Sequence, residues 1–113
     1  MDQLEQYKTV IKQTLDLFVE IYSEPEPSDV SYLRIFDDQR GQYMILRHGW
    51  NGKRRVQGIP LFARLVGNKV WVEEDWTDFE LVDRLIKAGI DRTHIVLAFH
   101  HPSLRKFTDF AVA

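Results

Sequence analysis

The sequence predicts an α+β fold, and three observations support that prediction. Apolar residues recur every three or four positions over residues 2–22, which is the period of an amphipathic helix. Four strand-like runs follow between residues 31 and 73 with short turns between them, which predicts an antiparallel meander. The helical period returns over residues 78–88, and a short apolar run follows at residues 95–99. The 113 residues are expected to form one domain, 1–113.

The N-terminal helix has clear start and stop signals. Asp2 is the expected N-cap, and Glu5 lies three residues later, as in a capping box. Residues 23–29 contain Pro25 and Pro27, so the helix is expected to end there and give way to an extended, mobile linker. The apolar face consists of residues at helical spacing: Leu4, Tyr7, Ile11, Leu15, Phe18 and Tyr22.

Turn residues delimit the four predicted strands. Asp37–Gly41 separates the first two strands, while Asn51-Gly52 and Gly67-Asn68 each predict a two-residue hairpin turn, because Asn and Gly tolerate positive φ. Gly58 and Pro60 interrupt the third strand, which predicts a bulge or an edge position. The predicted strands are residues 31–36, 42–50, 54–66 and 70–73.

The C-terminal third of the chain combines a second helix with a short strand. Thr77 or Asp78 is the expected N-cap of that helix, and Gly89 is the expected residue after its C-terminus. Ile95–Phe99 is wholly apolar, which predicts a short C-terminal strand that is buried. Pro102 ends this strand, and the remaining residues are expected to form a helical turn and an extended tail.

Composition excludes several classes of protein and site. Hydrophobic residues make up 44% of the chain and charged residues 28%, and the absence of cysteine excludes disulfides and thiolate chemistry. No apolar run approaches the roughly 20 residues of a membrane helix, and the N-terminus does not resemble a signal peptide, so we expect a cytoplasmic protein without membrane contact. The net charge of -2 argues against DNA binding by the chain alone and favours a protein partner.

Candidate catalytic groups are few. His100 and His101 are adjacent, so a metal site would need distant residues such as His48 or Asp75. The acidic run Glu73–Asp75 is interpreted as complementing the positive N-terminus of the second helix. Neither a glycine-rich phosphate loop nor a G-x-S-x-G elbow occurs. We therefore expect no enzymatic activity, no metal and no cofactor.

The segment Gly49–Arg55 is the strongest functional signal that the residues alone provide. It places Trp50 beside three successive cations, Lys53, Arg54 and Arg55, at the turn between two strands. Such a tip suits nucleic-acid phosphate, an acidic partner protein, or solvent alone with Trp50 closing the end of the core. The residue pattern leaves these three interpretations open, and the net charge favours protein over DNA.

Several motifs occur in a defined order along nearly the whole chain. They are Leu4–Tyr7 in the first helix, G-W-x-G-x-R-R-V at Gly49–Val56, a strand with D-x-T at Val70–Thr77, Ala88–Ile90 with Ile95–His100, and P-x-x-R-x-x-T-x-F-A-V-A at Pro102–Ala113. Together these motifs resemble the XisI family, the fdxN element excision controlling factors of cyanobacteria. The chain departs from the family pattern at Asp78, at Thr93-His94 and at Ala98, where the family often has glycine.

The resemblance implies a part in controlling the programmed excision of a DNA element. In such systems a separate site-specific recombinase cuts and joins the DNA, and XisI acts beside a nuclease-like companion, XisH. The leading hypothesis is therefore a non-enzymatic accessory protein that binds an XisH-like partner. The predicted partner-binding residues are Trp50, Lys53, Arg54, Arg55 and Arg105, the last together with the C-terminal tail.

Two alternative functions, and one expectation about assembly, accompany this hypothesis. The hairpin at residues 50–55 could bind DNA directly, or reach it through a recombination complex. A metal-assisted hydrolase would use Asp75, His100 and His101. An exposed edge of the predicted sheet would also allow a homodimer.

Overall fold

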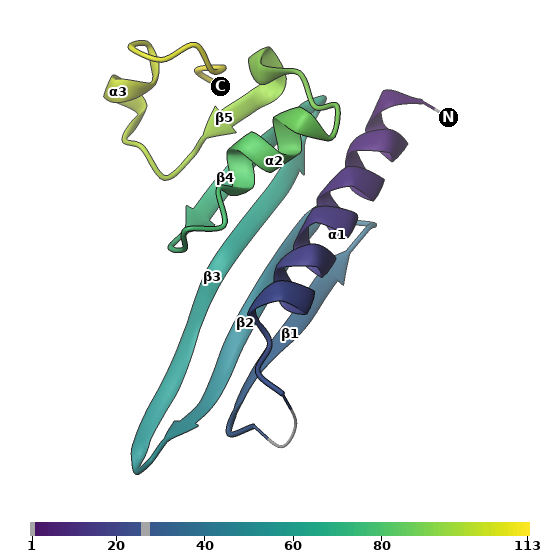
Figure 1. Ribbon diagram of the computed structural model, residues 1–113. Coiled ribbons are helices and arrows are strands. Elements are labelled where there is room, and N and C mark those ends of the chain that lie inside the picture. The colour runs from purple at the N-terminus through teal and green to yellow at the C-terminus, as the bar shows by residue number, and fades with distance from the viewer. Residues whose placement is uncertain (1, 26–27) are drawn as a thin grey trace.

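The computed structural model describes residues 2–25 and 28–113, so residues 26 and 27 of the predicted linker lie outside the described part. Its helices are α1 (Gln3–Tyr22), α2 (Leu81–Lys87) and α3 (Pro102–Arg105), with a 3-10 turn η1 (Arg92–His94). Its strands are β1 (Val30–Asp37), β2 (Gln42–Asn51), β3 (Arg54–Val66), β4 (Lys69–Asp75) and β5 (Ile95–Leu97). Figure 1 shows α1 and α2 on the same side of the sheet. None of the described helices has both the length and the apolar character needed to cross a membrane.

The five strands form one mixed sheet in the order β1-β2-β3-β4-β5. The pairings β1–β2, β2–β3 and β3–β4 are all antiparallel, which confirms the predicted meander. β5 pairs parallel to β4 over Val70–Val72, because α2 and η1 supply the long crossover that a parallel pair needs. A bridge between Val96 and Ala111 places the C-terminal tail beside β5.

The second helix begins three residues later than the sequence predicts, at Leu81 instead of residue 78. Its N-cap is Glu80, which has a positive φ of 60°, so the predicted cap at Thr77 or Asp78 is wrong. The physical reason is Phe79, which is only 1% exposed and enters the core from the loop before the helix. Packing of this ring overrides the local capping preference.

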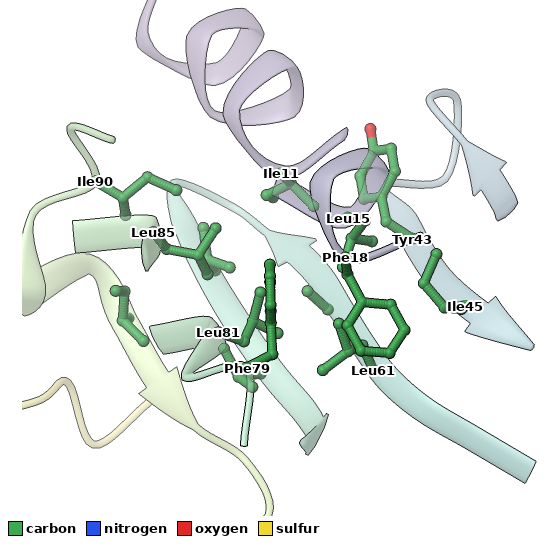
Figure 2. Close-up of a cluster of buried hydrophobic side chains, with 14 of the residues drawn as sticks. Ile11, Leu15, Phe18, Tyr43, Ile45, Leu61, Phe79, Leu81, Leu85 and Ile90 are labelled. Carbon is green, nitrogen blue, oxygen red and sulfur yellow. The ribbon is translucent and has the colours of Figure 1, made fainter. Parts of the chain in front are cut away.

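A single hydrophobic core lies between the helices and one face of the sheet, as Figure 2 shows. Side chains alternate along β2, so Tyr43 and Ile45 are buried in this core whereas Met44 lies on the opposite face. Complete burial of one large apolar side chain contributes about 1.5–3 kcal/mol. The largest fully buried side chains include Phe18, Ile11, Leu15, Leu61, Leu81, Leu85, Ile90 and Ile95.

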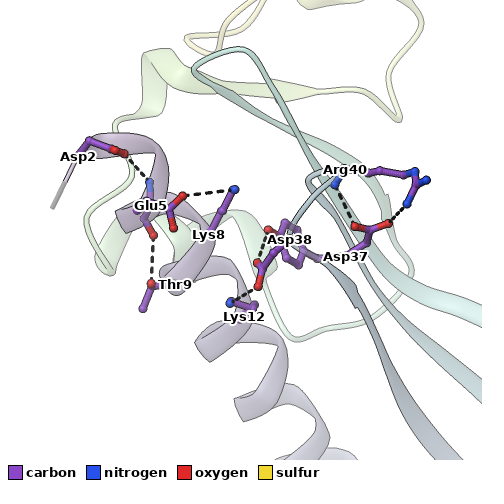
Figure 3. Close-up of polar contacts among 9 residues, drawn as sticks. Asp2, Glu5, Lys8, Thr9, Lys12, Asp37, Asp38 and Arg40 are labelled. Atoms are coloured by element: carbon purple, nitrogen blue, oxygen red, sulfur yellow. Dashed lines mark hydrogen bonds and ion pairs between the residues drawn. The ribbon is translucent and has the colours of Figure 1, made fainter.

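Polar contacts fix the N-terminus of α1 and tie this helix to the turn between β1 and β2 (Figure 3). The Asp2 carboxylate accepts a hydrogen bond from the Glu5 N–H at 2.9 Å, which confirms the predicted N-cap. The Lys12 ammonium and the Tyr43 hydroxyl each donate to Asp38 at 2.8 Å. These two hydrogen bonds, with that from Lys12 the stronger cause, lower the pKa of the Asp38 carboxyl. Burial, together with the bond to Asp38, raises the pKa of Tyr43.

Candidate interaction site

The β2–β3 hairpin extends beyond the part of the sheet that the helices cover, as Figure 1 shows. β3 pairs with β2 from Arg54 onward but pairs with β4 only from Leu61 onward. On its other side, the hairpin is supported by β1 only as far as Gly49, which pairs with Val30. Among the residues that the structure describes, no further strand therefore flanks residues 50–55, called the hairpin tip below, on either side.

Two glycines shape the hairpin. Gly52 has a φ of 63° and is the first of the two central turn residues, as in a type II′ turn. Asn51 is the last residue of β2, so the turn is centred one residue later than predicted. A Cβ atom on Gly49 would lie 1.9 Å from the Asp29 carbonyl oxygen, to which the Trp50 N–H donates at 3.0 Å. Gly49 is therefore required for the close approach of the segment before β1.

The hairpin tip exposes one aromatic ring and three cations. Trp50 is 50% exposed and lies outside the core cluster, so the interpretation that it closes the core is wrong. The Arg55 guanidinium lies 5.1 Å from the centroid of the Trp50 ring. Because Trp50 pairs with Arg55 and Asn51 pairs with Arg54, the stacked Trp–Arg pair and Arg54 lie on opposite faces of the hairpin. Lys53 lies exposed in the turn between them.

Arg105, the fifth predicted contact residue, does not join the hairpin tip. Figure 1 shows α3 and the β2–β3 turn at opposite ends of the molecule. Arg105 is only 9% exposed, and its guanidinium lies 5.3 Å from the centroid of the Trp71 ring. Its guanidinium also donates to the Ala98 carbonyl at 3.4 Å. These contacts hold the C-terminal segment against the sheet, which is a structural role that the sequence pattern did not reveal.

Three of the residues considered for a metal site, Asp75, His100 and His101, have local contacts instead. Within residues 2–25 and 28–113, no group of three or more His, Asp or Glu side chains is arranged to hold a metal ion. His101 accepts from the backbone N–H two residues later at 3.2 Å and so caps α3. The His100 ring centroid lies 4.8 Å from that of Phe99. Asp75 faces the N–H and the hydroxyl of Thr77, each at 3.4 Å.

The acidic run at the end of β4 does not complement the N-terminus of α2, contrary to the sequence interpretation. Glu73 forms an ion pair with Arg64 at 2.8 Å across the sheet. Glu74 accepts a hydrogen bond from the indole N–H of Trp76. α2 begins only at Leu81, after the loop that carries Phe79 into the core.

A pocket of about 870 Å³ lies where the C-terminal end of α1 approaches β1, β2, β3 and the loop after β4. We call it the aromatic pocket, because four of its lining residues are Phe18, Tyr22, Tyr32 and Trp76. Its charged lining residues are Arg47, Glu74 and Asp78. Part of β3, including Gly58, Ile59 and Pro60, also lines it.

The chemistry of the aromatic pocket suits a cationic side chain. Trp76 is 79% exposed, so its ring is available to a ligand. The Tyr22 hydroxyl donates to Asp78, and this hydrogen bond raises the pKa of Tyr22. Aromatic faces combined with two carboxylates attract a guanidinium or ammonium group. Sequence reasoning missed the pocket because it is assembled from several separated elements, and the aromatic residues were the only local signal.

The chain matches one family model and is similar to two proteins of known crystal structure. The family model described as XisI protein matches residues 1–112. The crystal structure of the fdxN element excision controlling factor XisI from Anabaena variabilis ATCC 29413 is similar to this chain, with 42% identity, a TM-score of 0.86, and coverage of 99% of this chain and 100% of that one. An XisI-like protein from the same organism has 27% identity, a TM-score of 0.90, and coverage of 97% and 99% respectively. No curated protein matched the chain.

Proposed function

Because the chain belongs to the XisI family, we propose that it is a non-enzymatic accessory factor that controls the excision of a DNA element by binding a companion protein. The similar protein of Anabaena variabilis is named an fdxN element excision controlling factor, and the proposal extends that role to this chain. The proposed companion is an XisH-like protein. The proposed contact is the hairpin tip.

The exposed Trp–Arg stack of the hairpin tip is the observation that supports this contact. Tryptophan and arginine are the residues most enriched among energetically dominant interface contacts. Trp50 is half exposed, so a partner could cover roughly 100 Å² of its surface and gain about 2.5 kcal/mol. Arg55 is already stacked against the ring, which lowers the entropy lost when a partner orders both side chains.

The charge of the hairpin tip indicates an acidic partner surface. Lys53, Arg54 and Arg55 are exposed cations on a chain whose net charge is -2. The basic character is therefore local, which favours docking onto a defined acidic patch over general attraction to DNA. Such a contact is expected to accelerate association at low salt.

Co-purification with the XisH-like companion tests this function. The combined variant Trp50→Ala/Lys53→Glu removes the ring and reverses one charge at exposed positions. We expect it to lose the companion while wild-type chain retains it. Lys87→Glu, which makes the same charge change on α2 away from the hairpin, is the matched control and is expected to retain the companion. Retention of the companion by the hairpin variant would contradict the proposed contact.

Direct DNA binding is the second candidate, because a two-stranded ribbon with three cations can enter a DNA groove. If all three cations contact phosphates, the logarithm of affinity should fall against the logarithm of salt concentration with a slope of about -2.7. A duplex-binding titration over several salt concentrations measures this slope. Binding that is absent, or that does not depend on salt, would eliminate this candidate.

A further inference from the structure

The part of β3 nearest the hairpin tip has an open edge. β3 pairs with β4 only from Leu61, and the Pro60 carbonyl accepts the Trp76 N–H at 3.0 Å. Residues 54–59, called the open edge below, therefore have β2 on one side, and no strand in the described part of the chain pairs with them on the other. In an antiparallel ladder, alternate residues direct their N–H and C=O groups away from the partner strand. Such an edge is a template for pairing with another chain.

Side chains of opposite charge lie near the two ends of the open edge. Arg54 is the first residue of β3, at the end near the turn. Near the other end, Glu74 of β4 and Asp78 of the following loop line the aromatic pocket together with Gly58 and Pro60. Arg47 also lines this pocket, so its three charged residues sum to a formal charge of -1.

Antiparallel pairing of two such edges about a two-fold axis brings unlike ends together. If the axis passes through Gln57, then Arg54 of one copy lies opposite Pro60 of the other. Pro60 is adjacent to Trp76 through the backbone hydrogen bond and also lines the aromatic pocket. A two-fold interface forms each contact twice, so the Arg54 of each copy lies near the aromatic pocket of the other.

The side chain of Arg54 lies on the correct face for this contact. Arg54, Val56 and Gly58 pair with Asn51, Gly49 and Arg47, so they alternate onto one face of the hairpin. Tyr32 pairs with Arg47 and its ring packs against Phe18 of α1, so the aromatic side of the pocket lies on this same, helix-covered face. Residues that lie opposite each other in an antiparallel pair share a face. The incoming Arg54 would thus reach the pocket.

We propose that two copies of this chain pair antiparallel along their open edges, with Arg54 of each copy entering the aromatic pocket of the other, near Glu74 and Asp78. Trp76, the most exposed tryptophan in the chain at 79%, would be covered by the incoming strand. Trp50 and Arg55 point to the other face of the hairpin and stay available for a companion protein. Arg54 is then committed to the dimer, so the companion contact would rest on Trp50, Lys53 and Arg55, and the dimer does not depend on the proposed function.

Sedimentation of the purified chain alone, over a range of concentrations, tests the dimer. Wild-type chain is expected to sediment as a dimer that dissociates on dilution. Arg54→Glu and Glu74→Arg are each expected to raise the dissociation constant at least about a hundredfold, because each places like charges together at both contacts. Lys87→Glu and Asp83→Arg, on the exposed surface of α2, are the matched controls and are expected to dimerise like the wild type.

Mixing the two disruptive variants gives the decisive result. A heterodimer of Arg54→Glu with Glu74→Arg pairs unlike charges at both contacts, so two variants that are monomeric alone are expected to dimerise when mixed. Circular dichroism and thermal unfolding verify that each variant is folded. A monomeric wild type, a dimer that Arg54→Glu leaves intact, or a mixture that stays monomeric would each overturn the proposal. Trp50→Ala/Lys53→Glu is expected to dimerise normally, so failure of companion binding and failure of dimerisation are distinguishable.

Discussion

The helix-covered body and the projecting hairpin of this protein are built on different principles. In the body, strand residues such as Tyr43, Ile45 and Leu61 are completely buried beneath α1 and α2. From Trp50 to Arg55 every residue of the same two strands is exposed. The difference indicates that the body supplies the stability and that the hairpin, held by backbone pairing and one glycine contact, is available for recognition.

The largest expected effect on stability is in the body, at Phe18. This ring is completely buried and lies 5.3 Å from Phe79 and 5.4 Å from Tyr32 between ring centroids. Phe18→Ala is expected to lower the free energy of unfolding by about 3–5 kcal/mol. Denaturant unfolding followed by circular dichroism measures the change. Leu104→Ala, at a side chain that is 50% exposed, is the control, and an equal loss in both variants would contradict the division between body and surface.

The next effect is expected at the junction between the two regions, at Gly49. Gly49→Ala places a methyl group against the Asp29 carbonyl in a backbone conformation that side chains rarely adopt. We expect the free energy of unfolding to fall by about 2–3 kcal/mol. Gly58→Ala on the same hairpin is the control, because its methyl group would meet nothing within 4 Å, and its cost is expected to stay within about 0.5 kcal/mol. Equal costs would show that the close approach at Gly49 is unimportant.

A smaller effect is expected where α1 meets the turn between β1 and β2, at Asp38. Its pKa is lowered in the folded protein by the hydrogen bonds from Lys12 and Tyr43, so the resulting stability is present above the unfolded pKa of about 3.9 and is lost as the pH falls through the folded pKa. Asp38→Asn should therefore be less stable than the wild type at neutral pH, by under about 1 kcal/mol, with the difference disappearing in acid. Unfolding curves measured across this pH range, with Asp83→Asn as control, test the prediction. A difference that grows in acid would contradict it.

The smallest expected effect on stability is at the hairpin tip. Trp50→Ala/Lys53→Glu removes the stack between Trp50 and Arg55 but opens no cavity in the core. Its cost in the free energy of unfolding is expected to be about 0.5 kcal/mol. A cost comparable to that of Phe18→Ala would show that the hairpin tip belongs to the folding core.

Local patterns predicted the elements well where neighbouring residues decide the structure. The helical stripe and the Asp2 cap predicted α1, and the turn residues predicted the four antiparallel strands. Two features that the sequence did not reveal depend on contacts between distant residues. Because Phe79 packs in the core, α2 begins only at Leu81. Arg105 packs against the Trp71 ring and therefore does not lie near the hairpin tip.

The hairpin tip itself was predictable because its residues are consecutive, whereas the aromatic pocket was not. Tyr22, Tyr32 and Trp76 converge only after α1, β1 and the loop following β4 have packed together. The sequence also does not show why position 49 requires glycine, because the backbone that a Cβ atom there would overlap belongs to Asp29, 20 positions earlier in the chain. The sequence thus located the hairpin tip, and the tertiary structure distinguished its exposed residues from Gly49, which has a structural role.

Titration calorimetry with the XisH-like companion, performed on the wild type and on Trp50→Ala/Lys53→Glu, shows whether the hairpin tip binds that companion. We expect the variant to bind at least about tenfold more weakly, equivalent to about 1.4 kcal/mol, while its unfolding midpoint stays close to that of the wild type. Equal affinity in the two proteins would contradict the claim that the hairpin tip is the recognition element.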